Sequence, residues 1–324
     1  MGFFWFTPFS EVLEFISNSN KIETMKSNLF LLIICVSLFL SCQTQEENAA
    51  LDTPTSGSLT VFADEGLKNM LENQAYTFMK IYSKAKINFE YTEEANAIKS
   101  LQENKCKTIA ISRNLSEKEE NWFKQSNITL NKSFIGKSAI VFIASKEVSD
   151  SVISTTLLKQ LLSGDTSKTF YKSCIFENKQ SSSAVFLRDS LIKETIGKNC
   201  YAAENFNDLL QRIQKNTHAL GVIDYAHISD SDDSISKYIK ANFKIIAVSK
   251  NIEKLAYYPD QSNIQTGDYP FTRSIYLIRR GQDFSLAAGF ITYVAGPSGQ
   301  VILLKTGFAP WRQPERVISI NLNN

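Results

Sequence analysis

The sequence predicts an α/β fold built around a largely parallel sheet. Short β-rich segments alternate with segments whose apolar residues recur at helical spacing, which is the pattern of parallel strands joined by helices. The 324 residues exceed one ordinary small domain, so about two domains are expected. Hydrophobic residues make up 43% of the chain and charged residues 21%, a globular composition.

Each expected element follows from this alternation. Residues 59–63 are rich in β-forming side chains, and the helix expected next carries Leu67, Met70 and Leu71 at helical spacing. Strands are expected at 59–63, 86–91, 108–112, 138–144, 173–177, 219–224, 243–249 and 274–279. Helices are expected at 65–82, 95–102, 117–125, 155–162, 183–196, 205–216, 284–294 and in a further run that ends at Gly307.

Charge and composition exclude two classes of partner. Lys and Arg number 35 against 33 Asp and Glu, and no dense basic run or RNA-binding aromatic motif occurs, so no nucleic-acid partner is expected. The chain has only two histidines and no cysteine spacing typical of metal sites, so neither a metal nor another cofactor is expected.

The segment from Met25, MKSNLFLLIICVSLFLSC, predicts a lipoprotein signal peptide at 25–41. Lys26 precedes an apolar run at 29–40 that is short for a transmembrane anchor, which is the alternative. Cys42 stands where bacterial lipoproteins carry the acylated cysteine. We therefore expect a membrane anchor at Cys42, a polar tether at 42–56 and a location in the cell envelope, at the periplasmic side of the inner membrane or at the outer membrane.

The remaining cysteines are Cys106, Cys174 and Cys200, because Cys35 lies in the predicted signal. An odd number leaves at least one free thiol in an oxidising compartment. Cys174 and Cys200 are candidates for a pair within one domain.

Three strand-to-helix junctions are candidate ligand sites, because open α/β sheets bind ligands outside the carboxyl ends of their strands. They are residues 63–66, 112–114 and 178–183. The serines at 181–183 allow three interpretations: a nucleophile, an anion cradle at a helix terminus, or an N-cap. No general base or nucleophile motif surrounds them, so no enzyme activity is expected.

Several motifs, in order, resemble those of the phosphate-binding proteins, the solute receptors of phosphate ABC transporters. They are the lipoprotein signal, IAISRNLSEKE, ENKQSSSAVF, YPFTRSIYLI and GPSGQVILLKTGFAP, and the resemblance covers about residues 57–320. Within this family, the sequence most resembles the lipoprotein members of the Bacteroidetes type. The resemblance implies a two-lobe periplasmic-binding-protein fold of type II, with lobe 1 at 57–143 plus 245–321 and lobe 2 at 144–244. It also implies a monomer that passes phosphate, or a related oxyanion, to an ABC permease.

The resemblance also implies ligand-binding residues. Ser181, Ser182 and Ser183 match the family's phosphate-binding serine and threonine segment, with Asn178 in the same junction. An ordinary serine N-cap is the alternative.

Two charged positions depart from the family pattern. Ser112 matches a ligand-contacting serine, but Arg113 stands where many members have aspartate, and Glu177 stands where they have arginine. We interpret this as an exchange of charges in which Arg113 binds the anion and Glu177 accepts its proton. A surface arginine and a solvated glutamate are the alternatives.

The first junction is the most acidic. Asp64 and Glu65 replace the family's threonine or serine, so only backbone amides at Glu65 and Gly66 are expected to contact the ligand. These carboxylates also support a second hypothesis, a surface or sensory scaffold lipoprotein whose anion site has degenerated.

Residues 1–24 precede the predicted signal and fit no part of it, so we expect translation to begin at Met25; a long leader is the alternative. Mass spectrometry of the amino-terminal peptide tests this. A peptide that contains Phe9 would show that the longer chain is made.

Overall fold

The computed structural model describes residues 52–178, 181–193 and 195–313, which all belong to one compact unit. The predicted signal peptide, the start at Met25 and the lipidation site Cys42 lie outside these residues.

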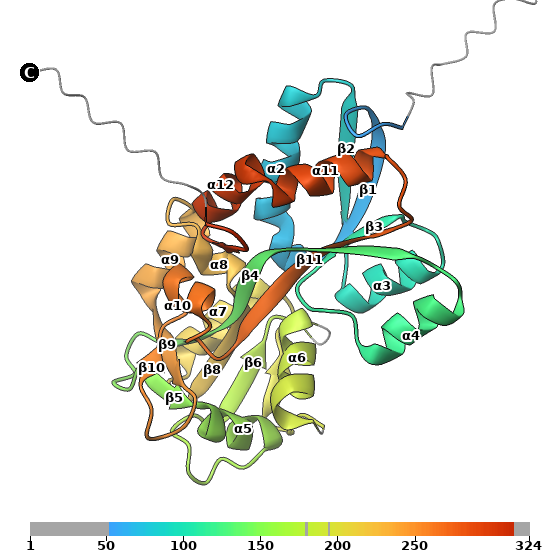
Figure 1. Cartoon of the computed structure of the whole chain (residues 1–324). Helices are drawn as coiled ribbons and strands as arrows, with labels where there is room; N and C mark the ends of the chain where they lie inside the picture. Colours follow the sequence, from blue (N-terminus) through green and yellow to red (C-terminus); the bar gives the residue numbers. More distant parts are fainter. Residues whose placement is uncertain (1–51, 179–180, 194, 314–324) are drawn as a thin grey trace, which may run out of the picture. The chain divides into compact units, whose positions relative to one another are not determined.

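The described chain alternates strands and helices, which confirms the predicted α/β class (Figure 1). The strands are β1 (Gly57–Ala63), β2 (Ala85–Tyr91), β3 (Thr108–Ile111), β4 (Leu130–Ser145), β5 (Val152–Ser154), β6 (Ser173–Phe176), β7 (Cys200–Ala202), β8 (Ala219–Asp224), β9 (Phe243–Ser249), β10 (Ala256–Tyr257), β11 (Thr272–Arg280) and β12 (Ala309–Pro310). The helices are the 3₁₀ helix η1 (Glu65–Leu67), α2 (Lys68–Ile81), α3 (Glu94–Gln102), α4 (Glu117–Gln125), α5 (Thr155–Ser163), α6 (Ser182–Leu187), the π-helix η2 (Arg188–Ile192), α7 (Phe206–Lys215), α8 (Ala226–Ser229), α9 (Ser234–Asn242), α10 (Gln261–Thr266), α11 (Leu286–Ala295) and α12 (Pro297–Lys305).

Strand β4 connects two groups of parallel strands. Its first part pairs antiparallel with β11, and its second part pairs antiparallel with β8 and β9. On one side β2, β1 and β3 are parallel, and on the other side β8, β6 and β7 are parallel. The division into lobes at 143/144 and 244/245 stays a prediction.

Two expected boundaries were wrong. Strand β4 begins at Leu130 rather than at 138. The apolar pattern did not reveal its first part, because that part is only partly buried and carries the polar residues Asn131 and Lys132. The helix expected to reach 196 changes to the π-helix η2 and ends at Ile192, because the next residue, Lys193, has a left-handed φ of 60°. A residue with that backbone cannot continue a right-handed helix.

Each of the two strand groups has helices packed against it. Helices α2, α11 and α12 contact one another beside β1 and β2 (Figure 1), whereas α7 packs on β4, β6 and β8. Among the described residues no single helix is long and apolar enough to cross a membrane; α11 and α12 reach that length only together, across a 63° bend.

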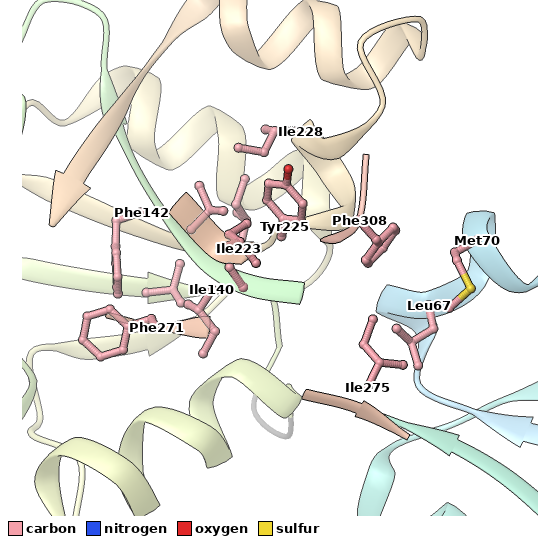
Figure 2. Close-up of a cluster of buried hydrophobic side chains, with 14 of the residues drawn as sticks. Leu67, Met70, Ile140, Phe142, Ile223, Tyr225, Ile228, Phe271, Ile275 and Phe308 are labelled. Atoms are coloured by element: carbon pink, nitrogen blue, oxygen red, sulfur yellow. The ribbon is translucent and has the colours of Figure 1, made fainter. Parts of the chain in front are cut away.

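The main core continues across β4 (Figure 2). Phe142 is fully buried, and its ring lies edge-on to Phe271 with the centroids 5.3 Å apart. The Tyr269 hydroxyl donates to the Ile140 carbonyl at 2.7 Å, which ties the segment before β11 to the same strand. Strand β4 and the segment before β11 are therefore packed into one continuous core.

We expect Phe142→Ala to lower the free energy of unfolding by about 3–5 kcal/mol, because it leaves a cavity beside Phe271. Urea unfolding measures this loss. The control is Phe284→Ala, since Phe284 is 86% exposed and its loss is expected below about 0.5 kcal/mol. Similar losses in both variants would contradict the described packing.

Candidate functional site

A cavity of about 540 Å³ lies where the two groups of parallel strands end. Its lining comes from the residues that follow β1, β2, β6, β7 and β8, which places it at the carboxyl edge of the sheet. The volume falls within the range of small-molecule sites, about 300–1,000 Å³. Six carboxylate side chains line it: Asp64, Glu65, Glu93, Glu177, Glu204 and Asp224.

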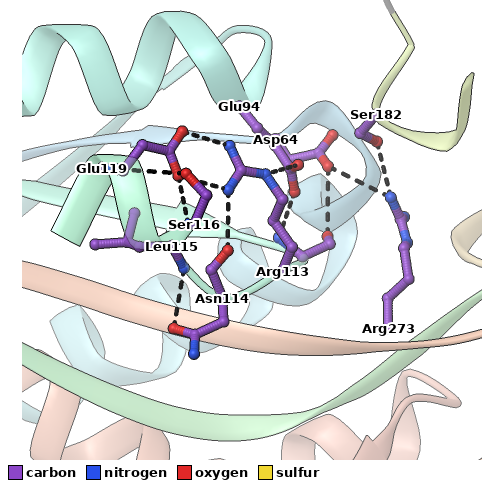
Figure 3. A network of polar contacts seen from close by, with 10 residues as sticks. Asp64, Glu94, Arg113, Asn114, Leu115, Ser116, Glu119, Ser182 and Arg273 are labelled. Atoms are coloured by element: carbon purple, nitrogen blue, oxygen red, sulfur yellow. Dashed lines mark hydrogen bonds and ion pairs between the residues drawn. The ribbon is translucent and has the colours of Figure 1, made fainter. Parts of the chain in front are cut away.

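A buried arginine, Arg273 of β11, connects several of these strand ends (Figure 3). It is 2% exposed, and its Nη1 donates to the Ser182 Oγ at 2.9 Å. Its Nη2 forms an ion pair with Asp224, and the Asp64 carboxylate lies 4.0 Å from Nη1. One guanidinium therefore holds together the start of α6 and the ends of β8 and β1.

The carboxylates around Arg273 are buried deeply enough to change their protonation. Burial raises the pKa of Asp224 to about 6, although the charge of Arg273 opposes the shift. Burial and the neighbouring charge of Asp64 raise the pKa of Glu94 to about 7. Glu94 also accepts the Ser112 amide at 2.6 Å. The region therefore gains or loses protons near neutral pH.

The serine segment lines the cavity at the start of α6, which continues directly into η2. The Ser181 hydroxyl caps the helix by accepting from the Ala184 amide at 3.2 Å, as the N-cap interpretation expected. Ser182 accepts from Arg273. No hydrogen bond of the Ser183 hydroxyl occurs among the described residues, although Ser183 is only 5% exposed. A hydroxyl that accepts keeps its own proton to donate, so all three can donate to a ligand.

Glu177 pairs with His227 at the edge of the cavity. The Glu177 Oε1 lies 3.2 Å from the His227 Nε2 and accepts the Asp224 amide at 2.9 Å. The imidazole stacks on Phe206, with the centroids 3.9 Å apart. Burial acts to raise the pKa of Glu177, but the hydrogen bond and charge of His227 lower it below its ordinary value. Burial acts to lower the pKa of His227, but Glu177 raises it.

The first junction also lines the cavity, through Glu65 and Gly66. The Gly66 amide donates to the Asp64 Oδ1 at 3.1 Å, so the cap of η1 already uses it. A Cβ at Gly66 would lie 2.7 Å from the Asp224 Oδ2, so this position requires glycine for close packing.

Two of the predicted site residues lie away from the cavity lining. Ser112 is fully buried, and its hydroxyl donates to Asp64 at 3.3 Å. Arg113 forms a bidentate pair with Glu119, both contacts at 2.9 Å, and lies 3.4 Å from Glu94 (Figure 3). The structure therefore brings together Glu65, Gly66, Glu177, Asn178, Ser181, Ser182 and Ser183, but neither Ser112 nor Arg113.

Sequence reasoning missed Arg273, Asp224 and His227. Arg273 is a charged residue within an apolar strand, and Asp224 ends another apolar strand; both are signals that the sequence contains. His227 carries no such signal. Among the residues that the structure describes, no group of three or more His, Cys, Asp and Glu side chains is arranged to hold a metal ion.

Stability is expected to fall as the pH rises from about 5 to 8, because Glu94 has a raised pKa of about 7 and folding therefore favours its protonated form. Glu94→Gln should reduce this fall by on the order of 2 kcal/mol, since glutamine still accepts the Ser112 amide. Urea unfolding across this pH range measures it. The control is Glu117→Gln, at an exposed position of α4. An unchanged pH dependence in Glu94→Gln would contradict the prediction.

Solved structures share this fold at low sequence identity. A putative phosphate ABC transporter substrate-binding protein from Clostridium perfringens, with bound phosphate, is 14% identical with a TM-score of 0.63; the match covers 79% of this chain and 100% of that one. An ABC-type phosphate transport receptor from Vibrio cholerae is 14% identical with a TM-score of 0.62; the match covers 78% of this chain and 99% of that one. A possible phosphate-binding protein from Planctomyces limnophilus is 14% identical with a TM-score of 0.54, covering 79% and 93%.

No curated protein matches the chain. A family model does: the PBP superfamily domain matches residues 48–298, which is more than half of the sequence. Together with the two groups of parallel strands that meet at β4, this match places the chain in the PBP superfamily.

Proposed function

We propose that the protein is a solute-binding protein that captures phosphate, or a similar tetrahedral oxyanion, in the cavity at the serine segment. The observation that carries the proposal is the set of hydroxyl donors at Ser181, Ser182 and Ser183 beside the buried Arg273. Hydroxyls at a helix amino terminus donate to an anion while the helix dipole favours its charge.

Arg273 is the cation that we assign to this anion. Arg273 does not line the cavity itself and is paired with Asp224, but its Nη1 donates to Ser182, which does line it. The guanidinium of Arg113 is bound by Glu119 and contacts none of the serines at 181–183. A direct role of Arg113 in binding stays a prediction. Arg273 lies on β11, which pairs with β3, and Ser182 follows β6 of the other strand group. An anion beside them would therefore favour the conformation in which both sides meet, as in ligand-induced closure.

The carboxylates of the cavity favour an anion that carries a proton. Asp64 and Asp224 already neutralise Arg273, so a fully ionised anion would meet net negative charge. Monohydrogen phosphate can donate its O–H to a carboxylate such as Glu177, whereas sulfate at neutral pH cannot. We therefore propose that phosphate is preferred to sulfate.

The route of delivery is part of the same proposal. Two of the similar structures are a putative phosphate ABC transporter substrate-binding protein and an ABC-type phosphate transport receptor, and the amino-terminal sequence predicts a lipid anchor at Cys42. We propose a monomer that is anchored in the cell envelope and passes its ligand to an ABC permease, without catalysis.

A second candidate is a surface or sensory scaffold whose anion site has degenerated. The excess of carboxylates in the cavity, and the pairing of both Arg113 and Arg273 with acidic side chains, favour it. Titration of the protein with anions separates the two candidates, because the scaffold requires no anion binding.

Isothermal titration of the protein with phosphate, sulfate and molybdate tests the proposal, and we expect phosphate to bind more tightly than sulfate. Ser183→Ala should weaken phosphate binding by about 10-fold, because it removes one hydrogen bond to a charged ligand. The control is Ser190→Ala in η2, where the exposed hydroxyl donates only to the Phe186 carbonyl. If none of the three anions binds, the proposal is wrong.

A further inference from the structure

Two cysteines lie opposite each other on adjacent strands at the end of the sheet. Cys174 of β6 and Cys200 of β7 are register partners in a parallel pair, and both are free thiols. Neighbouring strands lie about 4.8 Å apart, and side chains of register partners leave the same face. That spacing falls within the Cα separation that a disulfide needs, about 4.4–6.8 Å. The two thiols also lie within hydrogen-bonding reach of each other.

The two thiols differ in access. Cys174 is fully buried, and burial raises its pKa well above the ordinary value. Cys200 is half-buried, and its sulfur lies 3.8 Å from the Leu162 carbonyl oxygen and 3.8 Å from the Asn199 Oδ1. An oxidant therefore reaches Cys200 first.

The third described cysteine is not part of this pair. Cys106 belongs to the separate small core around α3 and β3, and burial raises the pKa of its thiol to about 11.

The segment between the two cysteines contains the serine segment and Glu177, which line one part of the cavity. It begins in β6, passes through Glu177 and the serine segment, continues through α6 and η2, and returns in β7. Strand β7 has only three residues and ends the strand order beside β6. A covalent link between Cys174 and Cys200 would therefore fix a weakly held edge and close the loop that contains the serine segment.

We propose that Cys174 and Cys200 form a reversible disulfide when the protein meets a small-molecule or protein disulfide. The Cys200 thiolate attacks the oxidant's disulfide, forms a mixed disulfide and releases one thiol of the oxidant. The Cys174 sulfur, after losing its proton, attacks the Cys200 sulfur and releases the second thiol. Two protein thiols are oxidised, and one disulfide of the oxidant is reduced to two thiols.

Treatment of the full chain with oxidised glutathione, followed by alkylation and tryptic mapping, tests the proposal. We expect the peptide of residues 173–179 linked to that of residues 199–212, and loss of the link in dithiothreitol. The thermal unfolding midpoint of the oxidised protein should rise by about 5–10 °C, because the link lowers the conformational entropy of the unfolded chain.

Matched variants assign the effect. Cys106→Ser should keep both the linked peptides and the rise in midpoint, whereas Cys200→Ser should lose both. Separate alkylation of Cys174 and Cys200 after oxidation, or a glutathione adduct that persists on Cys200, would overturn the proposal. If Cys200→Ser does not fold, the tryptic peptide map of the unaltered protein still shows whether Cys174 and Cys200 are linked.

Discussion

The burial of one permanent charge, the guanidinium of Arg273, constrains the rest of the site. Arginine keeps its proton at any pH that the protein meets, so burial at 2% exposure requires nearby carboxylates. Asp224 and Asp64 supply them from the ends of β8 and β1, and Ser182 adds a hydroxyl from α6. Because these groups come from both sides of β4, one interaction sets how the two strand groups meet.

This arrangement also determines what the cavity can bind. The carboxylates that stabilise Arg273 face the same space as the serine hydroxyls, so any anion there lies between donors and negative charge. A ligand that both accepts and donates hydrogen bonds satisfies both sets of groups. The pairing of Glu177 with His227 extends the same balance to the edge of the cavity, since each partner stabilises the charged form of the other.

Local sequence patterns predicted the fold and part of the site. The alternation of strands and helices and the serine N-cap depend on neighbouring residues, so both could be recognised. Arg273 and Asp224 lie 49 positions apart, and only tertiary packing brings them together. The pairing of Arg113 had a local signal that was missed: Ser116 and Glu119 form a capping box, which brings the Glu119 carboxylate to the same turn.

The central claim is that an oxyanion binds at the serine segment beside Arg273. A crystal structure of the protein grown with phosphate tests this most directly. The account predicts an ordered phosphate that accepts hydrogen bonds from the Ser182 and Ser183 hydroxyls inside the cavity. A cavity without phosphate at saturating concentration, or phosphate bound only elsewhere on the protein, would contradict it.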